Sequence, residues 1–263
     1  MMRQKLFANL LVAIAVLLTA SFAMSVCAQE SSREEGDLAV SEEIRRTFQL
    51  SSDDRVNVST IAGPVEVETT DGGTAEVHIV RSAQTRRELD CYRTIVEQTP
   101  GGLSIRHEQF SRREGCNNIR SRQRVQLVVP RTIELHIDTI AGDVNIGRID
   151  GALHLDAIAG EVRVAGARTA EISGLAKGLT MTLARIEGRG VRVSGIVGDT
   201  VFRVTDELNA DLTVSGIIGE ISTDASGVRL NRIDVSNYRV RIGAGGAPIS
   251  VSGVVGNVSV RRA

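Results

Sequence analysis

Two histidines and two aspartates recur at one spacing and have the chemistry of metal ligands. The motif LHID contains His136 and Asp138, and the similar motif LHLD contains His154 and Asp156 further along the chain. If the distance between the two motifs is one structural repeat, the histidines stack on each other and so do the aspartates, on one outer face. These four residues are the predicted metal site. The alternative interpretation is an ordinary solvated polar face.

A second set of oxygen ligands follows a recurring glycine. Its members stand directly after that glycine in successive repeats: Asp143, Glu161, Asp199, Glu220 and Asn257. Stacked carboxylates repel one another unless a cation or an arginine lies between them, and calcium or another divalent metal could fill that role. The simpler interpretation, which we prefer, is turn chemistry with arginine neighbours and no cofactor.

Arginines are concentrated between Arg81 and Arg124, where ten of them stand against five acidic residues. The pairs Arg86, Arg87 and Arg112, Arg113 are candidates for binding an anion, because guanidinium groups form bidentate contacts with carboxylates and phosphates. An envelope glycan, a lipid such as lipopolysaccharide, or a partner protein would supply that anion. The alternative is hydrated loop arginine without a ligand.

No sequence motif indicates catalysis. A nucleophile elbow, an HExxH zinc motif and a phosphate-binding loop are absent from the sequence. We therefore expect a non-enzymatic binding or interaction scaffold. Two alternatives remain open: a polysaccharide lyase or hydrolase built on a β-helix, and a signalling or capping partner of another envelope protein.

An internal repeat must position these residues. The segment TIAGDVNI at Thr139–Ile146 returns as AIAGEVRV at Ala157–Val164, and more loosely up to the end of the chain. The repeated glycines, with one asparagine, are Gly142, Gly160, Gly178, Gly198, Gly219, Asn237 and Gly256. Their steps of about 18 to 21 residues correspond to one coil of a parallel β-solenoid, whose coils bury apolar side chains only by stacking.

The expected fold is therefore all-β, a single-stranded parallel β-helix with strands that alternate apolar and polar residues. Right-handed coiling is favoured by the general crossover rule. A left-handed hexapeptide pattern through Ile140, Ile146 and Ala152 is the alternative, but the longer steps between the later glycines break it. We expect the glycines at the corners because of positive φ. We expect the last strand, with Arg261 and Arg262, at one open end of the stack.

The chain divides into four expected parts. Residues 1–28 have the layout of a signal peptide, with Arg3 and Lys5 before an apolar run. Residues 29–47 are polar and predict a disordered tether, residues 48–130 an N-terminal β region that caps the solenoid, and residues 131–263 the regular solenoid. The protein is thus expected in the periplasm or at the cell surface, with membrane contact only if the apolar segment is retained.

Two cysteines remain after the signal segment, Cys91 and Cys116. Because disulfides persist in oxidising compartments, we expect them to pair, with a stabilisation of about 3 to 4 kcal/mol from loop closure. The segment 88–97 nearby fits a strand or a short helix. A net charge of −1 argues against nucleic acid as a partner, and the scarcity of aromatic residues predicts a narrow aliphatic core.

The run from Phe48 onward resembles the bacterial putative adhesin family, a domain of unknown function with adhesin-like β-solenoid repeats. The shared features are an apolar pair before glycine, alternating valines after it, and a Val129–Pro130 step before the first regular coil. The resemblance covers nearly the whole mature chain and implies an exported protein of the cell envelope. The arginine-rich segment between Arg81 and Arg124 departs from the family pattern.

Overall fold

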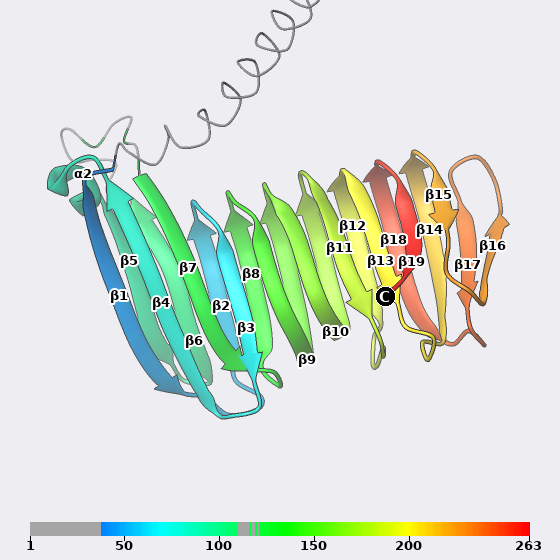
Figure 1. The fold of residues 1–263 in the computed structure, drawn as a ribbon, viewed down its shortest axis with the longest axis horizontal. Helices are drawn as coiled ribbons and strands as arrows, with labels where there is room; N and C mark the ends of the chain where they lie inside the picture. Colours follow the sequence, from blue (N-terminus) through cyan, green and yellow to red (C-terminus); the bar gives the residue numbers. More distant parts are fainter. Residues whose placement is uncertain (1–37, 110–115, 117–118, 120) are drawn as a thin grey trace, which may run out of the picture.

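The computed structural model describes residues 38–109, 116, 119 and 121–263. Within this part of the chain, nineteen strands form one mixed sheet, accompanied by the single short helix α2 (Arg86–Asp90). The strands lie side by side along the long axis of the molecule (Figure 1). The all-β prediction is confirmed. None of the helices that are described has the length and apolar character needed to cross a membrane, and the predicted signal segment 1–28 lies outside the described residues.

The parallel strands form two rows that run the length of the molecule. The first row consists, in spatial order, of β6 (Gly102–Gln109), β2 (Arg55–Ile61), β8 (Glu134–Ile140), the second halves of β9 (Val144–Ile158) and β10 (Glu161–Leu175), β12 (Val191–Val197), β18 (Ala247–Val255) and β14 (Ala210–Ile218). The second row consists of β7 (Ser121–Pro130), β3 (Val65–Thr70), the first halves of β9 and β10, β11 (Gly178–Leu183), β13 (Asp199–Val204), β19 (Val258–Arg262) and β15 (Ile221–Thr223). One strand from each row, joined by a turn, forms a layer.

Antiparallel strands extend both ends of the rows, so the sheet is mixed. At one end β5 (Tyr92–Thr99) pairs with β6, while β4 (Thr74–Ala83) and β1 (Val40–Gln49) continue the second row beyond β7. At the other end β17 (Tyr238–Ile242) and β16 (Val228–Arg232) follow β14. β1 begins inside the range expected to be a tether, because it pairs with β4 along its whole length and packs Ile44 and Phe48 against the core.

The undecided segment 88–97 contains both of the structures that its sequence fits. Helix α2 is capped by a reciprocal pair of hydrogen bonds between Thr85 and Glu88, and β5 follows it directly. Cys91 lies at the junction and forms a disulfide with Cys116, as predicted.

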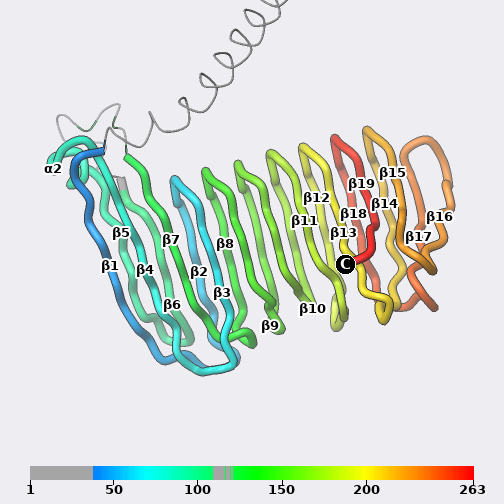
Figure 2. The backbone as a smooth tube through the Cα atoms, in the orientation of Figure 1, coloured from blue at the N-terminus to red at the C-terminus, as the bar shows by residue number. Residues whose placement is uncertain are grey.

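The layers do not follow the order of the chain at either end, which corrects the simple stacking that we expected. β2 lies between β6 and β8, and β18 lies between β12 and β14 (Figure 2). The last strand, β19, is thus enclosed between β13 and β15 rather than at an open end, and Arg262 forms an ion pair with Asp206. Asn237 is not a layer corner either, since it precedes β17 in the antiparallel hairpin β16–β17.

The six repeated glycines are needed for close packing, and four of them also have the positive φ that we expected. A Cβ on Gly160 would lie 1.9 Å from the backbone oxygen of Gly142, in the layer before it. Positive φ, between 125° and 152°, occurs at Gly178, Gly198, Gly219 and Gly256. In the turns of Gly142 and Gly160 the left-handed residues are Thr139 (φ 55°) and Ala157 (φ 52°), three residues earlier. Stacked corners leave no room for a side chain, and this explains the glycine at each repeat.

The core between the two rows is narrow and aliphatic, as expected. Leu153, Leu155 and Ile158 of β9 are paired in register with Leu135, Ile137 and Ile140 of β8, and all six side chains are at most 1% exposed. Inward side chains alternate with outward ones along each strand, so the polar residues of neighbouring strands align on the outer faces.

Candidate functional site

The predicted histidine pair forms in the first row. β8 and β9 are parallel and in register, so that His136 pairs with His154 and Asp138 with Asp156. The two imidazole rings stack with their centroids 4.3 Å apart and an angle of 29° between their planes. The constant repeat length therefore places these four residues as the sequence predicts.

Glu134 is the ligand candidate that sequence reasoning missed. Its Oε1 atom lies 2.7 Å from Nε2 of His136 and 3.5 Å from Nε2 of His154. Its other oxygen, Oε2, accepts hydrogen bonds from the guanidinium of Arg55 at 2.9 and 3.1 Å. A signal was present in the sequence, because residues 134 and 136 are two apart in a strand and must share a face.

The aspartates, in contrast, do not join the cluster. The ligand atoms of Glu134, His136 and His154 lie within 4.8 Å of one another, and this is the only such group of three or more in the described part of the chain. Asp138 accepts a hydrogen bond from the hydroxyl of Thr139, and Asp156 accepts one from the hydroxyl of Ser173. The cluster of possible ligands therefore contains two of the four predicted residues, His136 and His154, together with Glu134, and metal binding stays a prediction.

The next layer contributes Glu171 to the surroundings of His154. Its Oε2 atom lies 3.7 Å from Nδ1 of His154. A constant repeat length places Ile172 and Gly174 at the equivalent positions, but the pairing of β9 with β10 shifts by one residue between Ala167 and Thr169. Glu171 therefore pairs with His154. An irregularity of this kind cannot be read from repeat spacing.

The protonation states follow from burial and neighbouring charge. Burial raises the pKa of Glu134, but the hydrogen bonds with His136 and Arg55 outweigh it, so the pKa of this carboxyl lies below its usual value. Burial and the neighbouring His136 lower the pKa of His154. Glu134 is thus an anion and His154 a neutral imidazole at neutral pH, which are the forms that bind metal ions.

A hollow of about 410 Å³ adjoins the cluster on the side of the later layers. Glu134 and His154 form part of its wall, and Glu171, Arg189 and Arg192 form another part. The cluster is therefore accessible from solvent on one side while its backbone belongs to the rigid sheet.

Three side chains of the predicted calcium column accept hydrogen bonds from the backbone of neighbouring turns. Asp143 accepts a hydrogen bond at 2.9 Å from the backbone N–H of Glu161, in the following layer. Asp199 accepts one from the N–H of Asn257, and Asn257 accepts one from the N–H of Glu220. These three side chains thus connect stacked corners, while calcium binding by the column stays a prediction.

The predicted anion site is described only in part. Arg86 lies on α2 and forms an ion pair with Asp90 at 3.3 Å. Arg87 lies beside it on the same helix. Arg112 and Arg113 fall outside the described residues, so anion binding by these four arginines stays a prediction.

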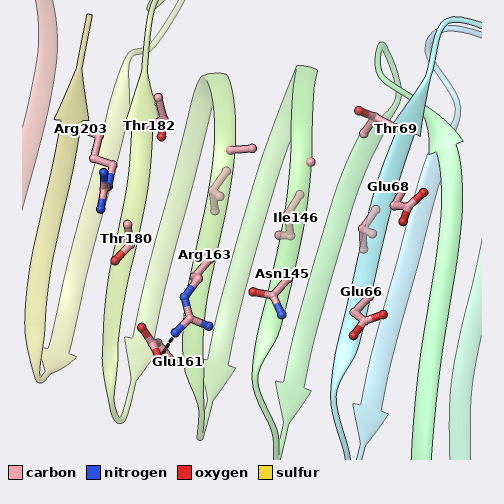
Figure 3. A pocket seen from close by; sticks show the side chains of 14 residues that line it. Glu66, Glu68, Thr69, Asn145, Ile146, Glu161, Arg163, Thr180, Thr182 and Arg203 are labelled. Atoms are coloured by element: carbon pink, nitrogen blue, oxygen red, sulfur yellow. Dashed lines mark hydrogen bonds and ion pairs between the residues drawn. The ribbon is translucent and has the colours of Figure 1, made fainter. Parts of the chain in front are cut away.

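A second candidate surface crosses the outer face of the second row (Figure 3). It is an open groove of about 930 Å³ that spans β3, β9, β10, β11 and β13. Gly147 and Ala165 leave its floor low, because neither has a long side chain. Its polar walls consist of Glu66, Glu68, Thr69, Asn145, Glu161, Arg163, Thr180, Thr182 and Arg203.

The groove walls carry both signs of charge and several neutral hydrogen-bonding groups. Arg163 donates to Glu161 at 2.5 Å, and Glu66 accepts from Gln126 at 2.9 Å. Asn145, which pairs with Glu66 and Arg163 on either side, offers an amide at the centre. This mixture suits a ligand with many hydroxyl groups and little net charge.

Comparison with known proteins gives weak structural likeness and no family. No family model matches the chain, and no curated protein matches it. A putative cell adhesion protein from Clostridium sporogenes ATCC 15579 is 10% identical over 85% of this chain and 100% of that chain, with a TM-score of 0.43. A putative adhesin from Bacteroides fragilis NCTC 9343 is 13% identical over 83% and 97%, with a TM-score of 0.31. A putative lipid binding protein from Parabacteroides distasonis ATCC 8503 is 15% identical over 84% and 97%, with a TM-score of 0.26.

Proposed function

We propose that this protein is an exported, non-enzymatic, adhesin-like β-solenoid that binds a polyhydroxylated polymer of the cell envelope in the groove of the second row. The observation that carries the proposal is the groove itself, which is open at the surface and crosses five strands. It is lined by acidic, basic and neutral polar side chains. A groove of this form accommodates an extended polymer rather than an enclosed small substrate.

The solenoid assignment is part of the proposal. Consecutive strands pair in parallel at a distance of one repeat, as in His136 with His154, and each layer places one strand in each row. Such layers enclose a core only by stacking. Right-handed coiling is the expected hand.

Export is supported by the Cys91–Cys116 disulfide, because disulfides persist in oxidising compartments. The expected location of the protein is the periplasm or the cell surface. A rigid sheet with an exposed groove would there serve as a scaffold for contact with glycan.

The test is binding of the purified full chain to a panel of envelope glycans, with the groove filled in one variant. Ala165 is exposed on the groove floor, so Ala165→Arg should block ligand without disturbing the core. Ser194→Arg, at an exposed position of the first row, is the matched control. Loss of binding in Ala165→Arg alone supports the proposal. Equal binding by all three proteins would exclude the groove.

A further inference from the structure

We propose that Glu134, His136 and His154 form a binding site for a late first-row transition-metal ion such as Zn²⁺, Ni²⁺ or Cu²⁺, with coordination positions left open to solvent. The site is independent of the proposed glycan groove, because the cluster lies in the first row and the groove in the second. The donor set is two imidazole nitrogens and one carboxylate oxygen.

The three donor atoms lie within 4.8 Å of one another. Oε1 of Glu134 is close to Nε2 of both histidines, at 2.7 and 3.5 Å. Ligand atoms of a tetrahedral zinc site are about 3.3 Å apart, given metal–ligand bonds of about 2.0 Å. The observed separations are near that value, so small side-chain rotations are enough to admit an ion.

Neighbouring side chains lie where they can orient Glu134 and His154. Arg55 binds Oε2 of Glu134 and leaves Oε1 directed at the histidines. Glu171 lies on the opposite nitrogen of His154, the position from which a carboxylate orients a ligating imidazole. Parallel pairing of β8 with β9 fixes the two histidines at one strand spacing.

The chemistry of the donors selects the metal. Imidazole nitrogen favours Zn²⁺, Ni²⁺ and Cu²⁺, whereas calcium takes six to eight oxygen ligands. One carboxylate oxygen cannot supply a calcium site. The hollow of about 410 Å³ beside Glu134 and His154 provides space for water or another small ligand on the ion.

The experiment is titration of the purified full chain, without a polyhistidine tag, with Zn²⁺ by calorimetry and with Cu²⁺ by electron paramagnetic resonance. We expect one ion per chain and a Cu²⁺ spectrum with coupling to two nitrogens. The variant His136→Ala/His154→Ala should lose at least about tenfold in affinity, and Glu134→Gln should also weaken binding. Cys27 is present in every protein compared, so its thiol cannot produce these differences.

The matched control is Asp138→Asn/Asp156→Asn, which changes the other stacked pair of the same two strands. It should bind Zn²⁺ and Cu²⁺ with unchanged affinity, and circular dichroism should show all variants folded. The proposal is overturned if the histidine variant binds as tightly as the wild type, if the aspartate variant loses as much affinity as the histidine variant, or if the Cu²⁺ spectrum shows no nitrogen coupling.

Discussion

The middle of the molecule and its two ends are built from the same layers but are connected differently. From β8 to β13 each layer pairs with the one before it in the chain, and partners such as His136 and His154 lie one repeat apart. At the C-terminal end, Val191 of β12 pairs with Ile249 of β18, which lies several repeats further along the chain. Identical layer geometry therefore does not require stacking in chain order.

The difference teaches which contacts depend on distant parts of the chain. When a middle layer forms, it closes only a short loop of chain, so the entropic cost is small, and successive layers can be added to the stack one after another. The C-terminal layers form only when β18 and β19 insert between strands that the chain has already passed. We expect the middle to tolerate the loss of a repeat and the C-terminal end not to.

Removing one layer from each region is the most severe test of this contrast. Deleting residues 247–263 removes β18 and β19, so that β12, β13 and β14 each lose one of two partner strands and β15 loses the only partner described for it. Five buried aliphatic side chains go with them, at roughly 2 kcal/mol each, which totals about 10 kcal/mol, the size of a typical net stability. Hydrogen exchange should show lost protection in all four remaining strands.

The matched deletion removes residues 144–161, one repeat of the middle. It joins Asp143 to Val162, and β8 then faces β10, whose apolar pattern is equivalent. This protein should fold, with a lowered melting temperature. If both deletions unfold the chain to the same extent, the contrast between the two regions is wrong.

The middle was also the part that could be predicted from the sequence. The stacking of His136 on His154 followed from a repeat of constant length, and the aliphatic core followed from alternation. Glu134 was within reach of the same reasoning, since it shares a face with His136.

The ends could not be predicted, for physical reasons. Strands β12, β14 and β18 present the same alternation of apolar and polar residues, so β12 fits β18 as well as it would fit β14. Chain order was then the only guide, and it is the wrong one here. The one-residue shift between Ala167 and Thr169, which brings Glu171 to His154, also leaves no mark on the repeat spacing.

Substituting corner glycines tests whether the middle and the C-terminal end have the same close packing at their corners, although their strands are connected differently. A Cβ on Gly160 in the middle or on Gly256 at the C-terminal end would lie within 2.3 Å of a backbone oxygen of an adjacent layer. Alanine at either position should lower the free energy of unfolding by about 3 kcal/mol. The control is Gly166→Ala, whose Cβ would meet only the flexible side chain of Arg148 at 3.3 Å and should change stability by less than about 1 kcal/mol. Denaturant unfolding measures all three, and a neutral Gly256→Ala would show that the C-terminal corner is looser.

The disulfide gives the N-terminal end a constraint that no described residue supplies at the C-terminal end. Cys91→Ser/Cys116→Ser should lower the free energy of unfolding by roughly 3 kcal/mol, because the disulfide closes a loop and lowers the entropy of the denatured chain. A compact denatured chain makes this loss slightly smaller than that of the glycine variants. The loss of hydrogen-exchange protection should be confined to α2, β5 and β6. Reduction of the wild-type protein is the control and should give the same result. A loss that extends to β12 and β13 would mean that the two ends are coupled through the middle.

The smallest expected effect is the pH dependence of stability that comes from one histidine of the N-terminal end, His107, and one of the middle, His154. Burial, followed by the charge of Arg81, lowers the pKa of His107, and burial followed by His136 lowers that of His154. A lowered pKa in the folded state means that the unfolded chain binds more protons, so the stability from each neutral imidazole is present above pH 6.5 and is lost as the pH falls below it. At His154 the carboxylates of Glu134 and Glu171 oppose the lowering of the pKa. His107 stacks on Tyr92 beside the buried Arg81, and no carboxylate opposes the lowering of its pKa.

His107 should therefore titrate at lower pH than His154, and nuclear magnetic resonance of the imidazole protons measures both directly. Urea unfolding at pH 7.5 and pH 5.5 should show a loss of stability on acidification that His107→Gln reduces more than His154→Gln does. Arg81→Gln is the decisive companion, because removing this cation should raise the pKa of His107 and leave that of His154 unchanged. If His154→Gln reduces the acid sensitivity more, the larger loss of stability comes from the half-buried cluster of the middle, and burial of His107 at the N-terminal end is not the stronger cause.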